Sequence, residues 1–417
     1  MRKYVSAILL SAAASAAGAP AADDRLVLLD GQSVRGTVEA IDSGGRVRLA
    51  GRPEPLDLQG LRAIERPVSP PRAAQAPSEV FFFDGGQVRA ADVALDGQIL
   101  RVRWAYGDLR LPLGAVAAIR LGTLPGEGPD VRPPEFDQAR ADPQVRRDHL
   151  LAIVATRIQV VRGAVQKIDS KDVFFIWDQE ERRIARPKVY GLVLARAGLR
   201  PGEAALRPAG ASQSSSEAGP APDLAGRCLV AFEDGSSVWM EVAGLSGGRL
   251  VGRAAGTDLA VPWAAVRGLR VRSTRLVFLS DLDPVEVEEE PLVTFGGPWQ
   301  RDRSVVGGPL KVGSTVYEKG LGVHSRTRLV YEVGGRFDTF AAVLGLDSSA
   351  DGRGDCVFQV LADGRELFAK RVRGSDPPHA VRLPVRGAAR LTLLVDWGED
   401  LDLADRADWC DARLLRD

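Results

Sequence analysis

Apolar and polar residues alternate with a period of two along the last third of the chain. Short alternating runs, among them residues 328–333 and 357–361, are separated by glycine or by Asp-Gly pairs. This pattern is typical of antiparallel strands that bury one face against a core, and no helical pattern of comparable length competes with it. The sequence therefore predicts a β-sandwich for residues 274–417, with two sheets packed face to face.

A degenerate internal repeat of alternating runs occupies residues 26–271. In three of its copies an Asp-Gly pair, at Asp30, Asp84 or Asp234, separates two alternating runs. Asp-Gly in this position is the strongest short signal for a β-hairpin. Another copy, between the second and the last, lacks the Asp-Gly pair but keeps the order of its apolar runs.

Each copy supplies several short strands in about 45 residues, which is the size of a small SH3-like or Sm-like β-barrel. We predict four such repeats, here called repeats 1 to 4, at residues 26–66, 79–122, 149–196 and 226–272. A barrel this small is marginally stable alone, so neighbouring copies are expected to pack together. The alternative is one irregular β-domain, against which the Pro-rich and Ser/Gly-rich joints between copies argue.

The first residues have the features of a secretory signal peptide. Arg2 and Lys3 precede an Ala-rich apolar run, and Ala19 and Ala21 fit a cleavage site, so residues 1–21 are predicted to be removed. An uncleaved membrane anchor is the alternative, although the apolar run is short for a span. No other run reaches the roughly eighteen apolar residues of a transmembrane helix, so we expect no membrane span after signal removal. The expected location is secreted, periplasmic or at the cell surface.

Two segments are predicted to be linkers from their composition. Residues 197–225 are rich in Pro, Ser, Gly and Ala, which predicts a flexible linker that proteases cut first. A run of acidic residues from Glu286 to Glu290 lies between Pro284 and Pro291, and we interpret it as a second linker.

Charge and motif content narrow the possible functions. Lys plus Arg and Asp plus Glu both total 55, so the formal net charge of zero gives no electrostatic reason to bind nucleic acid or an anionic membrane. Arg101, Arg103 and Trp104 faintly resemble an RNA-binding face, and we interpret them as a solvated strand face. No nucleophile elbow, zinc-protease helix or phosphate-binding loop occurs, so we expect no catalysis and no organic cofactor. Two carboxylates that meet in space would suffice for a glycosidase, which keeps that alternative open.

Five separated motifs in the C-terminal region occur in the order found in one known family. They are residues 278–282, 301–304, 307–310, 317–325 and 405–414. With them, the region from 274 to 417 resembles the novel putative carbohydrate-binding module (NPCBM) family, grouped with the family 51 carbohydrate-binding modules. The resemblance implies a jelly-roll, galactose-binding-like sandwich whose loops at one end hold a sugar. The implied partner is a galactose-type glycan or a cell-surface polysaccharide. Arg406 stands where the family usually has His.

Four residues of this region are candidate sugar contacts: His324, Trp299, Arg301 and Asp408. The imidazole of His324, which ends the Gly-Leu-Gly-Val-His motif, can donate to or accept from sugar hydroxyls. The indole of Trp299, in a Gly-Gly-Pro-Trp loop, can stack on a sugar. Arg301 and Asp408 lie within the matched motifs. The alternative for each is a structural role, with Trp299 in the core and Asp408 tying the last strand to a loop.

Three carboxylates form a candidate metal site. Asp347, Asp351 and Asp355 crowd one Gly/Ser-rich loop, and spaced oxygens of this kind can hold calcium, which takes about six to eight oxygen ligands. A solvated loop without calcium is the alternative.

The cysteines predict one disulfide. Cys356 and Cys410 replace small residues of the resembled family, and in an oxidising compartment such a pair of changes predicts a bridge between them. Two buried thiols are the alternative. Cys228 is expected to be a free thiol that points inward.

Together these observations predict a secreted, non-catalytic, multidomain protein that binds carbohydrate through its C-terminal sandwich. Two other functions stay open. One is a structural protein of the envelope or extracellular space, whose sandwich binds other envelope proteins, and the other is the binding arm of a hydrolase complex.

Overall fold

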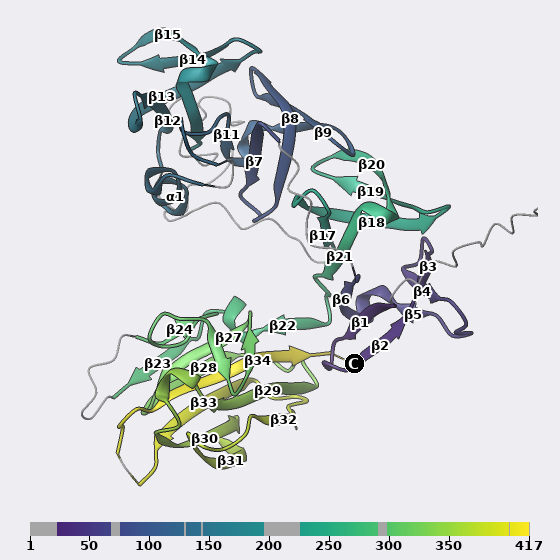
Figure 1. The fold of residues 1–417 in the computed structure, drawn as a ribbon. Coiled ribbons are helices and arrows are strands. Elements are labelled where there is room, and N and C mark those ends of the chain that lie inside the picture. The colour runs from purple at the N-terminus through teal and green to yellow at the C-terminus, as the bar shows by residue number, and fades with distance from the viewer. Residues whose placement is uncertain are drawn as a thin grey trace, which may run out of the picture.

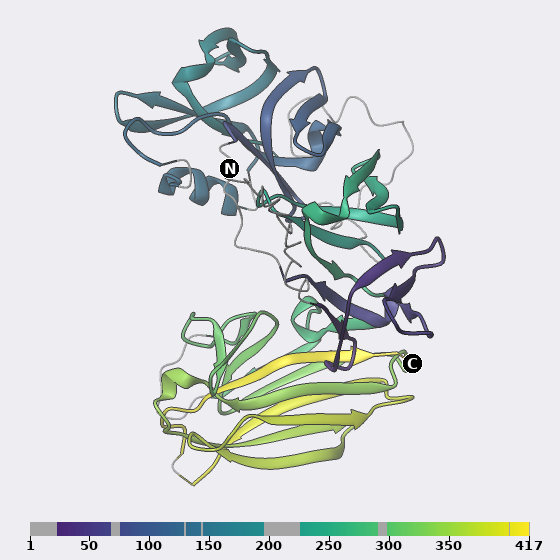
Figure 2. The same ribbon diagram turned by 45° about the vertical axis from the view of Figure 1, so that its right-hand side comes forward.

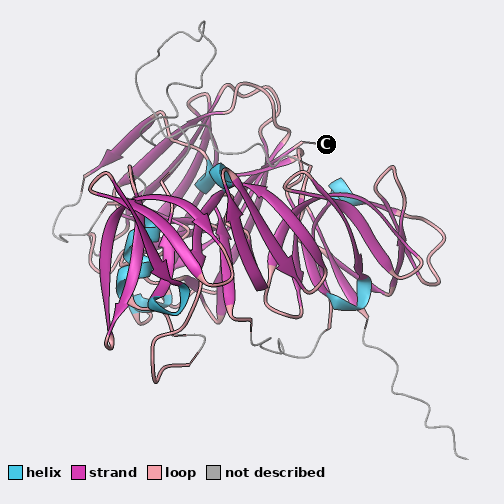
Figure 3. Cartoon of the chain, turned by 90° about the horizontal axis from the view of Figure 1, so that it is seen from above, coloured by secondary structure: helices cyan, strands magenta, loops and turns pink. Residues whose placement is uncertain are grey.

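The computed structural model describes residues 23–67, 76–128, 131–142, 145–195, 226–290, 298–399 and 401–416. Strands dominate this part of the chain, so the predicted all-β fold class is confirmed (Figure 3). The predicted signal peptide, residues 1–21, and the predicted linker, residues 197–225, lie outside the described residues. No helix in the described ranges has the length and apolar character needed to cross a membrane.

The repeats are built from short antiparallel strands. Repeat 1 contains β1 (Asp24–Leu28), β2 (Ser33–Gly36), β3 (Val38–Ile41), β4 (Arg46–Leu49), β5 (Leu56–Asp57) and β6 (Leu61–Glu65). Repeat 2 contains β7 (Ser78–Phe82), β8 (Gln87–Asp96), β9 (Ile99–Trp104), β10 (Gly107–Pro112) and β11 (Val116–Arg120). Repeat 3 contains β12 (Asp148–Val154), β13 (Arg157–Ile168), β14 (Asp172–Trp177), β15 (Glu180–Ala185) and β16 (Val189–Val193). Repeat 4 contains β17 (Cys228–Phe232), β18 (Ser237–Ser246), β19 (Arg249–Ala254), β20 (Thr257–Pro262) and β21 (Val266–Val271).

Burial in these strands follows the alternation of the sequence, as in β9, where Leu100, Val102 and Trp104 are buried and the residues between them are exposed. A short 3-10 turn precedes the last strand of every repeat: η1 (Leu58–Gly60), η2 (Leu113–Ala115), η3 (Arg186–Lys188) and η5 (Trp263–Ala265). After this turn the last strand pairs with the first strand of its own repeat. The two ends of each repeat are therefore held together by backbone hydrogen bonds.

The repeats lie in a different order in space from their order in the sequence. β6 of repeat 1 pairs with β21 of repeat 4, and β11 of repeat 2 pairs with β16 of repeat 3. Repeats 2 and 4 also touch, so the row reads 3, 2, 4, 1, and the sandwich follows next to repeat 1 (Figures 1 and 2). Pairing between last strands covers an edge that would otherwise be open to other chains.

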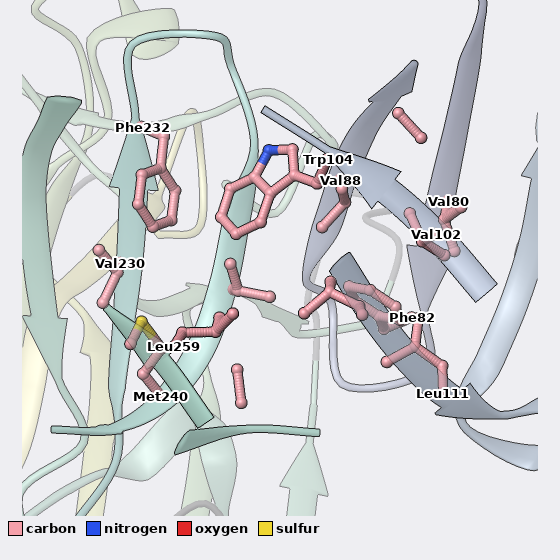
Figure 4. Packing of buried hydrophobic residues seen from close by; sticks show 14 of the residues in the cluster. Val80, Phe82, Val88, Val102, Trp104, Leu111, Val230, Phe232, Met240 and Leu259 are labelled. Carbon is pink, nitrogen blue, oxygen red and sulfur yellow. The ribbon is translucent and has the colours of Figure 1, made fainter. Parts of the chain in front are cut away.

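Repeats 2 and 4 are joined by two reciprocal contacts between a tryptophan and an Asp-Gly turn. Trp104 Nε1 donates to Asp234 Oδ2 at 2.8 Å, and Trp239 Nε1 donates to the backbone oxygen of Asp84 at 3.0 Å. The Trp104 ring also packs edge-on against Phe232, with 4.7 Å between ring centroids (Figure 4). The Asp-Gly pairs thus make the hairpin turns and also the contact between repeats. Buried apolar side chains from all four repeats meet in one large cluster, and a second, smaller cluster lies between repeats 2 and 3.

The Pro-rich joint between repeats 2 and 3 contains an α-helix, α1 (Pro134–Ala141), which the sequence pattern did not predict. Proline is tolerated at the first helical position because the N–H that it lacks would have no partner there. Phe136 of this helix is fully buried and packs edge-on against Phe81 and Tyr190, at centroid distances of 5.9 and 5.4 Å. The helix therefore fills the space between repeats 2 and 3.

The C-terminal sandwich consists of two antiparallel sheets and a hairpin. The first sheet contains β22 (Leu276–Phe278), β24 (Gln300–Arg301), β27 (Gly320–His324), β34 (Arg406–Leu415), β29 (Thr339–Leu346) and β32 (His379–Pro384). The second contains β23 (Glu286–Glu289), β28 (Thr327–Glu332), β33 (Arg390–Trp397), β30 (Asp355–Ala362) and β31 (Arg365–Arg373). The hairpin of β25 (Leu310–Val312) and β26 (Thr315–Tyr317) covers the outer face of the first sheet, and two 3-10 turns complete the fold, η6 (Leu279–Asp281) and η7 (Ser348–Ala350).

The acidic run at Glu286 is a strand and not the predicted linker. β23 forms the edge of the second sheet, where Arg328 pairs with Glu286 at 3.2 Å and with Glu288 at 3.0 Å. Charged side chains on an edge strand discourage pairing with other chains, which explains why a strand carries this composition.

The predicted disulfide between Cys356 and Cys410 is wrong. Both residues are buried thiols, and so is Cys228. Cys356 lies in the core between the two sheets, whereas Cys410 packs with Leu310 and Val312 under the hairpin, on the other face of β34. The first sheet therefore lies between the two sulfur atoms. Burial also raises the pKa of Cys228 to about 12, so this thiol stays protonated.

The sandwich is tied to repeat 1 through a bulge in β34. At the bulge Asp411 has a φ of 55°, and its carboxylate accepts from both terminal nitrogens of Arg62, at 2.5 and 2.7 Å. Arg413 donates to the backbone oxygens of Leu29 at 3.1 Å and Asp30 at 2.8 Å. These bonds fix the end of β34 against the Asp-Gly turn of repeat 1.

Candidate functional site

Loops from both sheets meet at the end of the sandwich away from repeat 1, here called the distal end. It comprises residues 324–326, 346–355, 397–399 and 401–406, where β27 and β33 finish and β30 and β34 begin. Leu401 and Leu403 are exposed there although they are large and apolar, with relative exposures of 48% and 54%. Apolar surface beside polar side chains is the usual composition of a ligand site.

His324 lies at the edge of this end, with 9% of its surface exposed. Burial lowers the pKa of its imidazole below the usual range, a hydrogen bond to the backbone of Asp405 opposes this shift, and the charge of Arg406 adds to it. The imidazole is therefore neutral at pH 7. The single N–H of the neutral ring donates to the Asp405 backbone, which leaves the other ring nitrogen as an acceptor for a ligand.

Arg406 is the residue of this site that the sequence reasoning missed. It lies directly opposite His324 in the pairing of β27 with β34, and its Nη1 donates to the backbone oxygen of Ser349 at 2.6 Å. Directly opposite residues on an antiparallel pair share a face, so the imidazole and the guanidinium side by side form one polar surface. The only signal in the sequence was that Arg406 replaces the usual His of the resembled family.

Trp299 and Arg301 are not brought together with His324. Arg301 pairs directly opposite Leu321, a core residue, so the two side chains face the inside of the sandwich while His324 faces outward. The Arg301 guanidinium lies 5.1 Å from the centre of the Trp299 ring, whose other contacts are with the core. Arg301 also donates to Asp283 at 2.6 Å. These contacts stabilise the edge of the first sheet.

Asp408 is fully buried, so its carboxyl cannot contact a ligand at the surface, and the prediction of a sugar contact is corrected. It lies between Gly322 and Gly345 on the neighbouring strands. A Cβ at Gly322 would come within 2.4 Å of the Arg303 oxygen, and one at Gly345 within 2.3 Å of Val312. The two glycines let the hairpin and the 302–309 loop close over Asp408.

The covered carboxyl of Asp408 shares a proton with Asp347. Burial, followed by the hydrogen bond and the charge of Asp347, raises the pKa of Asp408 to about 9. Burial alone would raise the pKa of Asp347, but hydrogen bonds from Asp408, from Ser349 and from the Lys311 backbone together lower it. At neutral pH Asp408 is thus the protonated donor and Asp347 the ionised acceptor.

The predicted calcium site is not formed. Asp347 accepts from Lys311 N at 3.1 Å and Ser349 N at 2.9 Å, and Asp355 accepts from Arg371 Nε at 2.7 Å. Asp351 is exposed at the end of η7. Across the described residues, no group of three or more acidic, histidine or cysteine side chains is arranged to hold a metal ion. Asp347 and Asp355 are thus engaged in separate contacts, and the three carboxylates do not converge on one point.

Comparison with known proteins identifies the sandwich. The family model described as NPCBM/NEW2 domain matches residues 275–415. The C-terminal sandwich is an NPCBM/NEW2 domain. A Renibacterium salmoninarum protein named "Putative endo-alpha-N-acetylgalactosaminidase" is 34% identical to this chain over 110 residues. The match covers 26% of this chain and only 7% of that protein, so the chain spans a small part of its relative.

Solved structures similar to this chain include CBM51 modules. The module of Clostridium perfringens GH95 with methyl-galactose is 26% identical, with a TM-score of 0.31, over 33% of this chain and 99% of that chain. The CBM51-2 and INT domains of Clostridium perfringens ZmpB with GlcNAc are 23% identical, with a TM-score of 0.32, over 40% of this chain and 37% of that one. The tandem CBM51 modules of a Streptococcus pneumoniae family 98 glycoside hydrolase are 13% identical, with a TM-score of 0.31, over 64% and 88% of the two chains.

Replacing Asp408 by Asn should change how the stability of the NPCBM domain depends on pH. In the native protein Asp408 keeps its proton up to about pH 9, whereas the unfolded carboxyl releases it near 3.8. The native state thus binds more protons between these values, and its stability falls as pH rises through them. Asp408→Asn keeps an N–H donor toward Asp347 and removes the titration, so its stability relative to the parent should rise from pH 5 to pH 9.

Urea unfolding at pH 5, 7 and 9 measures this effect. Asp408→Ala, which has no donor, is the control and should lose about 1–3 kcal/mol at pH 5. Parallel pH profiles for the parent and Asp408→Asn would contradict the shared proton.

Proposed function

We propose that the NPCBM domain of this protein binds a carbohydrate non-covalently at its distal end, with His324 and Arg406 as direct contacts. The proposed ligand is a galactose-type glycan or a cell-surface polysaccharide. The observation that carries the proposal is the neutral imidazole of His324, fixed by Asp405 and paired across the strands with Arg406. The remaining ring nitrogen of the neutral imidazole can accept from a sugar hydroxyl, and the guanidinium supplies donors to the sugar oxygens.

The surroundings of His324 also support binding at this end. Exposed Leu401 and Leu403 offer apolar surface for the C–H face of a sugar ring. Asp405 holds the loops in place, because it accepts from Ser325 Oγ and, at 2.9 Å, from Asp355 N. A preorganised site lowers the entropy cost of binding a flexible ligand. The name of the matched family supports carbohydrate as the ligand class.

The proposed role of the whole chain is non-catalytic and lies outside the cytoplasm. The protein is secreted, periplasmic or displayed at the cell surface. In this proposal the repeats act as a carrier that presents the NPCBM domain. Other envelope proteins are the proposed partners of the repeats. Strands of neighbouring repeats pair with each other, and side chains of repeats 1 to 4 form a common core, which supports a rigid carrier.

His324→Ala tests the site. A glycan array on the intact chain first selects the sugar, and calorimetry then compares the parent with His324→Ala and Arg406→Ala. Each variant should bind at least about tenfold more weakly, a loss of about 1.4 kcal/mol, because a polar contact to the sugar disappears. The near-UV circular dichroism should stay unchanged.

His149→Ala is the matched control, because it removes an imidazole from repeat 3 and should leave the affinity unchanged. Equal affinity of the parent and His324→Ala would place the sugar elsewhere. An array with no bound glycan would contradict the proposed function.

A further inference from the structure

A deep cleft of about 1330 Å³ separates the NPCBM domain from repeats 1 and 4. One wall is the outer face of the sheet that β18, β17, β21, β6 and β1 form across the two repeats, and the other is the outer face of β29 and β32. Arg62, Asp411 and Arg413, which are bonded to one another, also line the cleft. It lies at the opposite end of β34 from His324.

The wall formed by the repeats presents a continuous row of side chains. Trp239, Leu229, Arg270, Ala63 and Val27 lie directly opposite one another across the five strands. Directly opposite residues point to the same face, so this row forms a flat strip with an indole at one end. The indole N–H already donates to Asp84, which holds the ring in place and leaves only its carbon face for a ligand.

The facing wall is smooth and carries one cation. Ala341 lies opposite Arg382, and Val343 lies opposite Ala380, in the pairing of β29 with β32. All four side chains line the cleft. Small side chains keep the wall open, and Arg382 projects from it.

The cleft has an excess of positive charge. Seven Arg or Lys side chains line it against five carboxylates. Four of the carboxylates, including Glu65 and Asp411, are neutralised by neighbouring cations. Arg272 and Arg382 form no ion pair within the described part of the chain. Arg227 lies next to Arg272 across the strands and forms an ion pair with Glu241 at 2.7 Å. The Glu241 carboxylate is therefore paired with Arg227 and not with Arg272.

We propose that this cleft binds a segment of an anionic glycan, a sugar chain carrying carboxylate or sulfate groups. A pyranose ring stacks on Trp239, and anionic groups pair with Arg272 on one wall and Arg382 on the other. The guanidinium fork matches the paired oxygens of carboxylate or sulfate. A volume above the usual 300–1,000 Å³ of small-molecule pockets fits several sugar units, and a domain interface is a common place for such a site. The inference is independent of the distal site.

Calorimetry on the intact chain tests it with three probes: a galacturonic acid trisaccharide, a sulfated galactose trisaccharide and the neutral galactose trisaccharide. We expect at least one charged probe to bind in 50 mM salt and to weaken as salt rises, since the contacts are ionic. The double variant Arg272→Ala/Arg382→Ala and the single variant Trp239→Phe should each weaken binding of that probe, the double variant by about tenfold or more. If only one of the two charged probes binds, its charged group, carboxylate or sulfate, is the group that the cleft recognises.

Arg101→Ala/Arg110→Ala is the matched control, since it removes two exposed arginines from β9 and β10 of repeat 2 and gives the same net charge. Equal weakening by this control, unchanged binding in both cleft variants, or no binding of either charged probe would overturn the inference. His324→Ala should leave charged-probe binding intact. If it alone abolishes that binding, the anion occupies the distal site, so the cleft proposal fails while the proposed function stands.

Discussion

Trp104→Ala is expected to lower the free energy of unfolding of the repeats by about 3–5 kcal/mol, the usual cost of deleting a large buried aromatic side chain. Only 4% of Trp104 is exposed. Its ring packs edge-on against Phe232 and against Tyr106, at 4.7 and 5.1 Å, and its N–H donates to Asp234. The substitution removes this contact between repeats 2 and 4 and leaves a cavity in the cluster that all four repeats share.

Trp177→Ala is the matched control for this experiment. Trp177 ends the third strand of repeat 3 as Trp104 ends the third strand of repeat 2, but 46% of Trp177 is exposed. Its removal should cost less than about 0.5 kcal/mol, as is usual for surface positions. Urea unfolding followed by far-UV circular dichroism measures both changes. Similar losses for the two variants would show that the contact between repeats 2 and 4 contributes little.

Asp411→Asn is expected to loosen the NPCBM domain from repeat 1 and to cost about 3 kcal/mol, because it leaves two arginines without their carboxylate. Asp411 pairs with Arg62 at 2.5 Å and with Arg413 at 2.9 Å. At most a quarter of each of these side chains is exposed, so solvent screens the pairs only in part. Asn tolerates the left-handed backbone at this bulge, so the change removes the charge without adding backbone strain.

Calorimetric unfolding measures this effect as a separate, lower-temperature transition of the NPCBM domain. The control is Asp283→Asn, which breaks the ion pair with Arg301, where 93% of the Asp283 side chain is exposed. It should cost no more than about 1 kcal/mol, as exposed pairs do. If Asp411→Asn unfolds in a single transition at the same temperature as the parent, other contacts hold the NPCBM domain to repeat 1.

Much of the fold could be predicted because its signals are local. Alternation within each strand and the Asp-Gly turns at Asp84 and Asp234 depend only on neighbouring residues, and the structure has strands where these patterns occur. The same reasoning missed α1, whose eight residues lie in a segment that reads as a Pro-rich joint. The acidic run at Glu286 was predicted to be a linker but forms a strand, because an edge strand and a linker can have the same charged composition.

The candidate site was predicted less well, because a site depends on which face of a strand each residue occupies. His324 and Arg406 share the outer face of the first sheet, whereas Trp299 packs on the inner side. Asp408 is near His324 in space but lies beneath the hairpin. A motif gives the order of residues along the chain. Which face of the sheet each side chain occupies is fixed only when the strands pair.

Period-two alternation, turn residues and ordered motifs lie along the chain, so the all-β class, the strand-rich repeats and the family of the C-terminal domain could be predicted from the sequence. The paired last strands of repeats 2 and 3 are more than 60 residues apart in the chain, and those of repeats 1 and 4 more than 190, so no local pattern predicts the stacking order 3, 2, 4, 1. Tertiary pairing sets this order. It also decided that Cys356 and Cys410 cannot meet. The bulge at Asp411 shifts the alternation of β34, and a local pattern does not say which face of a sheet will be buried against which partner.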